Sequence, residues 1–129
     1  MKGKHSLFGA GKPFRAKEFP FTDSKNKYDN YLLNKEHPVG KSKAEFIEKN
    51  FGYTKGDSEM LHKAISESID GRIPDYVEKT KYGEKHSFNS KIRGKDGKMH
   101  SANIVVVVQK DNIEKPWRLI TIKPGKKDK

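Results

Sequence analysis

Apolar positions in the first half of the chain recur at the spacing of amphipathic helices. The pattern predicts three helices, over residues 26–34, 42–51 and 57–69. Ser42 and Glu45 form a capping-box pattern at the start of the second helix. The apolar faces are expected to consist of Tyr28, Tyr31 and Leu32 in the first helix, Phe46, Ile47 and Phe51 in the second, and Leu61, Ala64, Ile65 and Ile69 in the third.

Glycine and proline indicate where these helices end. Pro38 disfavours helical geometry at His37, so the first helix is expected to stop before the pair. Gly52 and Gly71 follow the second and third helices at the usual position of a C-terminal stop. The first half of the chain is therefore predicted to be helical, with short connections.

The periodicity changes to two after residue 75. Strands are predicted over residues 76–81, 85–93, 100–109 and 117–123, and residues 94–97 contain an Asp-Gly pair typical of a hairpin turn. The third strand includes an uninterrupted apolar run, for which we expect cover on both faces. Helices followed by strands predict an α+β fold, with N-terminal helices packed on an antiparallel meander of about four strands.

The two ends of the chain differ in composition from the part between them. Residues 1–25 are interrupted by glycine and proline yet rich in aromatic side chains, so we expect an extended basic and aromatic segment that lays some of them on the domain or a partner. The α+β domain is predicted over residues 26–124, and residues 125–129 form a basic tail. The large apolar residues of the first segment are Leu7, Phe8, Phe14, Phe19 and Phe21.

The net charge of the 129-residue chain is +11, and its distribution is uneven. Residues 1–55 carry 12 basic and 6 acidic side chains, residues 56–90 carry 5 and 7, and residues 91–129 carry 11 and 4. Two basic ends around a mildly acidic middle favour one basic face assembled from both ends, and a polyanionic partner such as nucleic acid. An acidic protein partner is the alternative.

Several kinds of chemistry are excluded or disfavoured by the residues present. The chain has no cysteine, which excludes disulfides, thiolate catalysis and cysteine zinc sites. Its five histidines show no metal-binding spacing and no pair of carboxylates stands out, so no cofactor is expected. No apolar run approaches the roughly 20 residues needed to cross a bilayer.

Metal-independent RNA cleavage needs only the side chains that remain. RNA supplies its own nucleophile, the 2′-hydroxyl, and the protein supplies a base, an acid and groups that stabilise the charged phosphate. His37 beside Lys41 and Lys43 at a helix N-terminus is the first candidate segment. The alternative for this segment is an ordinary turn with surface lysines.

The last predicted strand is the second candidate segment. Arg118, Thr121 and Lys123 carry groups that bind phosphate, although the alternative is a strand with a solvated face. In a regular strand Arg118 would face away from Thr121 and Lys123, so if all three serve one site the strand must bend or Arg118 must reach round its end. His86 and His100 are reserve candidates for acid or base.

Part of the chain resembles a known family of bacterial domains. The motif Tyr-Leu-Leu-Asn-x-Glu-His-Pro-Val-Gly at residues 31–40, Gly-Tyr-Thr at 52–54, Tyr-Gly at 82–83 and Arg-Leu-Ile-Thr at 118–121 resemble C-terminal toxin domains of polymorphic and contact-dependent growth inhibition systems. These are similar in layout to the barnase–EndoU–colicin–RelE ribonuclease superfamily. Many members end in Thr-Ala-Tyr-Pro, where this chain has Thr-Ile-Lys-Pro at residues 121–124.

The resemblance implies a secreted effector domain that acts in the cytoplasm of a target bacterium. Its implied substrate is transfer RNA, its implied partner is a cognate immunity protein, and a host translation factor is a further candidate partner. The implied catalytic residues are His37, Arg118 and Thr121, with Lys41 and Lys43 on phosphate. Two competing hypotheses remain: a non-catalytic nucleic-acid-binding module, and an interaction module for an acidic protein.

Overall fold

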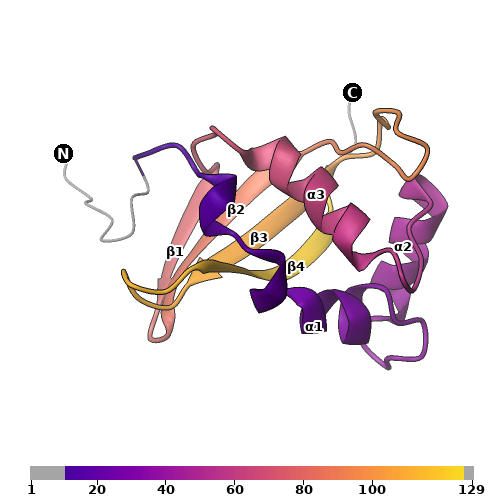
Figure 1. The fold of residues 1–129 in the computed structure, drawn as a ribbon, viewed down its shortest axis with the longest axis horizontal. Helices are drawn as coiled ribbons and strands as arrows, with labels where there is room; N and C mark the ends of the chain where they lie inside the picture. Colours follow the sequence, from indigo (N-terminus) through magenta and orange to yellow (C-terminus); the bar gives the residue numbers. More distant parts are fainter. Residues whose placement is uncertain (1–10, 127–129) are drawn as a thin grey trace.

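The sheet is an antiparallel meander. The computed structural model describes residues 11–126, and the strands lie in the order β1-β2-β3-β4 (Figure 1). Each neighbouring pair is antiparallel, which confirms the predicted α+β fold. The strands are β1 (Tyr76–Thr80), β2 (Gly83–Ser90), β3 (Ile104–Lys110) and β4 (Trp117–Pro124).

The helices precede the strands in the chain. Among them, α3 packs against β2, whereas α1 and α2 pack against β4 (Figure 1). The helical elements are the short 3-10 turns η1 (Ala16–Glu18) and η2 (Phe21–Asp23), α1 (Lys25–Lys27), the π-helical turn η3 (Tyr28–Leu32), α2 (Lys41–Phe51) and α3 (Ser58–Ile69).

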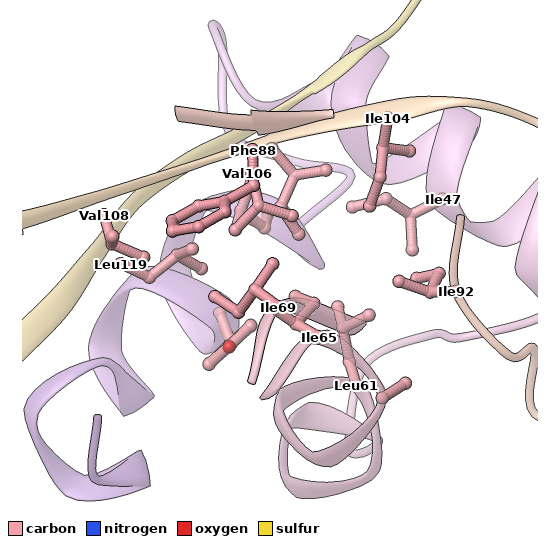
Figure 2. Close-up of a cluster of buried hydrophobic side chains, with 14 of the residues drawn as sticks. Ile47, Leu61, Ile65, Ile69, Phe88, Ile92, Ile104, Val106, Val108 and Leu119 are labelled. Carbon is pink, nitrogen blue, oxygen red and sulfur yellow. The ribbon is translucent and has the colours of Figure 1, made fainter. Parts of the chain in front are cut away.

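The core lies between α3 and the sheet. Figure 2 shows the predicted stripe of α3 pointing toward apolar side chains of β2, β3 and β4. Leu61, Ile65 and Ile69 recur at intervals of four, so one face of the helix covers the strands. Their partners from the strands are Phe88, Ile104, Val106, Val108 and Leu119, and α2 adds Ile47.

Residues 14–25, in the described part of the N-terminal segment, are part of the folded unit. Phe14 and Phe19 are buried in the core, and the backbone of Phe14 exchanges hydrogen bonds with Gly71 and Arg72. The ring of Phe14 meets that of Phe88 edge-on at 5.4 Å. The expectation that aromatic residues of this segment lie on the domain is confirmed for this pair. Leu7, Phe8 and residues 127–129 lie outside the described residues.

Local details of the predicted helices differ in the structure. The helix expected over residues 26–34 is α1 continued by η3, in which the amide of Leu33 bonds the carbonyl of Tyr28. The predicted capping box is not formed, because α2 begins at Lys41 with Gly40 as its N-cap. Gly52 ends α2 with a φ of 84°, as its position predicted.

The connection between β2 and β3 is longer than predicted. β2 ends at Ser90 and β3 begins at Ile104, and one isolated bridge between Arg93 and Met99 closes the Asp-Gly turn. Gly97 has a φ of 81°, the conformation for which a glycine was expected at this turn. The turn is therefore local and does not join two long strands.

A β-bulge in β4 changes which side chains share a face. Val107 pairs with Thr121 but Val108 pairs with Leu119, so β4 holds one extra residue at Ile120. Leu119 and Ile122 consequently both reach the core although they are three residues apart. Arg118 pairs with Gln109, two residues from Val107, so Arg118 and Thr121 share the face turned away from the core. In a regular strand Arg118 and Thr121 would lie on opposite faces, and the bulge places them on the same one.

Buried hydrogen bonds hold His62 of α3 in the core. Its Nδ1 accepts from the Tyr28 hydroxyl at 2.7 Å, and its Nε2 donates to the carbonyl of Phe19 at 2.8 Å. Both ring nitrogens are thus satisfied by the neutral imidazole. His62 connects the N-terminal segment, η3 and α3, so its role here is structural.

Acid is expected to destabilise the fold through its buried histidines. Burial lowers the pKa of His62, and also that of His86, below the ordinary value of 6.5. Below pH 6.5 the unfolded chain therefore binds more protons than the folded chain. The two histidines contribute fully to the free energy of unfolding above pH 6.5, and this contribution is lost as the pH falls toward their folded-state pKa values. The slope is at most about 1.4 kcal/mol per pH unit for each histidine. Urea unfolding between pH 7.5 and 5.5 measures it.

A His62→Gln variant serves as the comparison. It should show a lower free energy of unfolding at pH 7.5 and a flatter dependence on pH than the parent chain. Higher stability of the parent at pH 5.5 than at pH 7.5 would contradict the assignment.

Candidate functional site

His37 organises the turn that leads into α2. Its Nδ1 accepts hydrogen bonds from the backbone amides of Val39 at 3.0 Å and Gly40 at 2.9 Å. Since an amide can only donate, Nδ1 presents its lone pair to these groups and neutral His37 carries its proton on Nε2. The imidazole thus binds the amides of the N-cap residue and of the residue before it, directly ahead of α2.

Tyr31 packs against this turn. Its ring meets the imidazole of His37 edge-on at 5.0 Å between centroids. Gly40 lies so close to Tyr31 that a Cβ on residue 40 would stand 2.3 Å from the Tyr31 carbonyl oxygen. The close approach between η3 and the turn therefore requires glycine at position 40.

Gly40→Ala is expected to displace the His37 turn. The φ of Gly40 is −78°, so the effect comes from steric overlap and not from backbone strain. Overpacking of this kind typically costs about 1–3 kcal/mol, measurable by thermal or urea unfolding. Gly11→Ala is the control, because a Cβ there meets no atom within 4 Å. Equal stability of the two variants would argue against the described packing.

Lys43 brings the first candidate segment to the last strand. Its Nζ donates to the hydroxyl of Thr121 at 2.6 Å, across 78 residues of sequence. The same ammonium lies 5.3 Å from the centroid of the Tyr31 ring, and the ammonium of Lys27 lies 5.2 Å from it. We call Lys27, Tyr31, His37, Lys43 and Thr121 the Tyr31 cluster.

The two lysines of the Tyr31 cluster lack an acidic partner. Neither Lys27 nor Lys43 forms an ion pair within residues 11–126, whereas Lys25 pairs with Asp29 and Lys35 pairs with Glu48. Two ammonium groups without a carboxylate partner make the local potential positive, and a bound anion would neutralise it. The cluster is therefore suited to an anionic ligand.

Two more of the predicted lysines lie near the Tyr31 cluster in the chain. Lys41 is the exposed first residue of α2, two positions before Lys43. Lys123 is exposed. It pairs with Val105 of β3, whereas Thr121 pairs with Val107, two positions further along β3. Lys123 thus shares the outer face of the sheet with Thr121, although no contact between either lysine and the cluster is seen.

Three other predicted site residues are not brought to the Tyr31 cluster. Arg118 lies three residues before Thr121, about 10 Å along a strand, and its guanidinium forms a bidentate pair with Asp111 at 3.1 and 3.2 Å. His100 lies in the β2–β3 connection, where its Nε2 is 3.1 Å from Asp96. His86 faces the helical side of the sheet, opposite to Thr121.

The chain was compared with known families, proteins and structures. A family described as a domain of unknown function (DUF6883) matches residues 22–126. The chain belongs to the DUF6883 family. It has no match among curated proteins and none among solved structures. The family description assigns no activity, so the function of this DUF6883 domain has to be inferred from its site.

Neither a metal cluster nor a membrane-spanning helix is found in the described part of the DUF6883 domain. Its residues 11–126 contain no group of three or more His, Asp or Glu side chains placed to hold a metal ion. None of the helices in that range is long and apolar enough to span a bilayer.

The Tyr31 cluster of the DUF6883 domain is rich in donors but lacks an available base. Lys43 and Lys27 supply ammonium groups, Thr121 a hydroxyl, and His37 the N–H of Nε2, all of which suit phosphate oxygens. The lone pair of His37 is already used by two amides, so taking a proton there would break both bonds. The geometry assigns His37 a hydrogen-bond donor role.

Sequence patterns missed two members of the Tyr31 cluster. Tyr31 was expected on the apolar face of a helix, and Lys27 was one lysine among many. In η3, Tyr28 and Leu32 are buried while Tyr31 is half-buried and turned toward His37. The Tyr-Leu-Leu-Asn motif that starts at Tyr31 was the available signal, because it directly precedes the histidine motif.

Proposed function

We propose that this DUF6883 domain binds RNA on the Tyr31 cluster and cleaves it without a metal ion, as the toxin domain of a bacterial competition system. One observation carries the proposal: Lys27 and Lys43 lie over one tyrosine ring without a carboxylate partner, and Lys43 reaches Thr121 from the opposite half of the chain. Phosphate is the anion that such a surface fits, and tyrosine adds a face on which a base can stack.

In the proposed reaction the ribose 2′-oxygen attacks the adjacent phosphorus. A bond forms between that oxygen and phosphorus, the bond from phosphorus to the 5′-oxygen breaks, and the products are a 2′,3′-cyclic phosphate and a 5′-hydroxyl. The 2′-hydroxyl proton passes to a solvent water molecule, because the Tyr31 cluster offers no free lone pair, and the 5′-oxygen takes up a proton from the ammonium of Lys27 or Lys43. Lys43, Thr121 and the Nε2 of His37 would donate to the phosphate oxygens as negative charge develops.

The toxin assignment also predicts partners. Transfer RNA is the proposed substrate, and a cognate immunity protein would cover the basic surface in the producing cell. Because the chain carries a net charge of +11, acidic side chains are expected on that partner.

A non-catalytic RNA-binding module is the second candidate function. It is favoured by the occupied lone pair of His37, since the amides of Val39 and Gly40 leave this histidine without a proton-accepting nitrogen. In this alternative the Tyr31 cluster binds phosphate and base but performs no proton transfer.

Incubation of the purified chain with total transfer RNA in EDTA tests both functions. Cleavage is expected to yield fragments with 2′,3′-cyclic phosphate ends, and DNA should be spared because it lacks the 2′-hydroxyl. Salt-sensitive binding without cleavage would favour the second candidate. The absence of both would overturn the proposal. Growth arrest on expression of the domain alone, relieved by co-expression of the adjacent gene, would support the toxin role.

A further inference from the structure

A pocket lies on the helical side of the sheet, away from the outer face that carries Thr121. It has a volume of about 520 Å³, within the range of small-molecule sites. The N-terminal segment forms one wall and the β3–β4 region the other. Its polar lining residues are Lys12, Arg15, Glu18, His86 and Lys110, and we call it the His86 pocket.

His86 is a positioned imidazole in this pocket. Its side chain is 2% exposed, its ring packs on Trp117 at 4.6 Å between centroids, and its Nε2 donates to the carboxylate of Glu84 at 3.0 Å. The hydrogen bond to Glu84 leaves the lone pair of neutral His86 on Nδ1. An imidazole oriented by a carboxylate is a common arrangement for accepting a proton or a hydrogen bond.

The Nδ1 atom of His86 is available to a ligand. It makes no hydrogen bond to any residue in the described range, and no fully buried side-chain polar atom there is left unsatisfied. Nδ1 therefore keeps access to the pocket that His86 lines. In contrast to His37, this histidine has an unused lone pair, and burial lowers its pKa so that the neutral form is favoured.

Three cations surround the same pocket. Lys12, Arg15 and Lys110 form no ion pair within the range that the structure covers, and Lys110 lies over the ring of Trp117 at 5.6 Å. Glu18 is the one carboxylate among the lining side chains. The lining is therefore net positive, which favours an anion beside the His86 imidazole.

We propose that the His86 pocket binds a ribonucleotide, with the phosphate held by Lys12, Arg15 and Lys110 and a ribose hydroxyl donating to Nδ1 of His86. The choice of a ribonucleotide among phosphate esters rests on the proposed function.

The pocket and the Tyr31 cluster lie at different points along β4. Trp117 lines the pocket and Thr121 belongs to the Tyr31 cluster, and the two residues are four positions apart in the strand, about 13 Å. The edge of β4 between them is covered, because η2, α1 and α2 lie against β4 and the amide of Leu119 donates to the Ser24 hydroxyl. The two sites are therefore separate and lie on opposite faces of the sheet.

Trp117 provides a direct test because it is the chain's single tryptophan. Its fluorescence is followed while the full chain is titrated with adenosine 3′-monophosphate, the 2′-deoxy analogue or inorganic phosphate. Saturable binding of the ribonucleotide is expected, about fivefold tighter than that of the deoxy analogue, as one hydrogen bond predicts. Nitrogen-15 NMR should show the ribonucleotide shifting Nδ1 of His86 more than Nε2.

Matched variants test the phosphate contacts. Lys110→Gln and Arg15→Gln should each weaken binding about tenfold, whereas Lys115→Gln, which removes the same charge from the β3–β4 loop outside the pocket lining, should leave it unchanged. Three results would overturn the proposal: no saturable change in Trp117 fluorescence, equal losses of affinity in all three variants, or equal affinities for the three ligands without a change in the His86 nitrogen signals.

The two proposals can fail independently. Nucleotide binding without RNA cleavage would contradict the proposed function but support the pocket. RNA cleavage without nucleotide binding would support the proposed function but contradict the pocket.

Discussion

Replacing Lys27 and Lys43 together by glutamine is expected to lower RNA affinity about 100-fold at low salt. Each lysine supplies a charge-assisted hydrogen bond to phosphate worth about 1.5 kcal/mol, and two such losses amount to about 3 kcal/mol. The dependence of affinity on salt should also become shallower by about one unit of log–log slope for each contact removed. Filter binding or fluorescence anisotropy with transfer RNA at several salt concentrations measures both quantities.

The matched control removes the same charge from the same region. Lys25 and Lys35 already pair with Asp29 and Glu48, so the double variant Lys25→Gln/Lys35→Gln should change RNA affinity much less. Similar losses in both double variants would show that net charge alone governs binding. The Tyr31 cluster would then have no special role.

Phe19→Ala is expected to have a large effect on stability. The Phe19 side chain is 1% exposed and packs on Phe14 and His62, so truncation leaves a cavity in the core. Such a change typically costs about 3–5 kcal/mol. Since small domains are stable by about 5–15 kcal/mol, the variant should be close to unfolding at 37 °C. Urea unfolding followed by circular dichroism measures the change.

Lys17→Ala is the control in the same segment. Lys17 is exposed in η1, and surface changes of this kind usually stay within about 0.5 kcal/mol. If Phe19→Ala were equally mild, the N-terminal segment would have to be a detachable arm and not part of the core.

The order and approximate extent of the main elements follow from local sequence patterns. The stripe of Leu61, Ile65 and Ile69 reports a helix face, because those positions return to the same side every turn. The two-residue periodicity of the predicted strand placed His86 and Phe88 on one face of β2, and both side chains are buried on the helical side of the sheet. Gly52 marks a helix end because its backbone geometry favours glycine. These features depend on neighbours within a few residues.

The bulge in β4 depended on contacts that no local pattern contains. The extra residue at Ile120 lets both Leu119 and Ile122 reach the core, and it turns Thr121 outward toward Lys43. Tertiary packing decided this outcome. The start of α2 was missed for a local reason, because the helix begins at Lys41, one residue before the predicted cap at Ser42.

By itself, the sequence determined the α+β class with an antiparallel meander and a net positive charge. It also identified His37, Lys43 and Thr121 as candidate residues of one phosphate-binding site. Only the tertiary structure decided which nitrogen of each histidine keeps a lone pair. In His37 two backbone amides occupy it, whereas in His86 the bond to Glu84 leaves it free. The physical reason is that residue type determines which groups a side chain offers, while the partners actually taken depend on the folded backbone, which places Glu84 beside His86 on β2 and joins Lys43 to Thr121 across 78 residues.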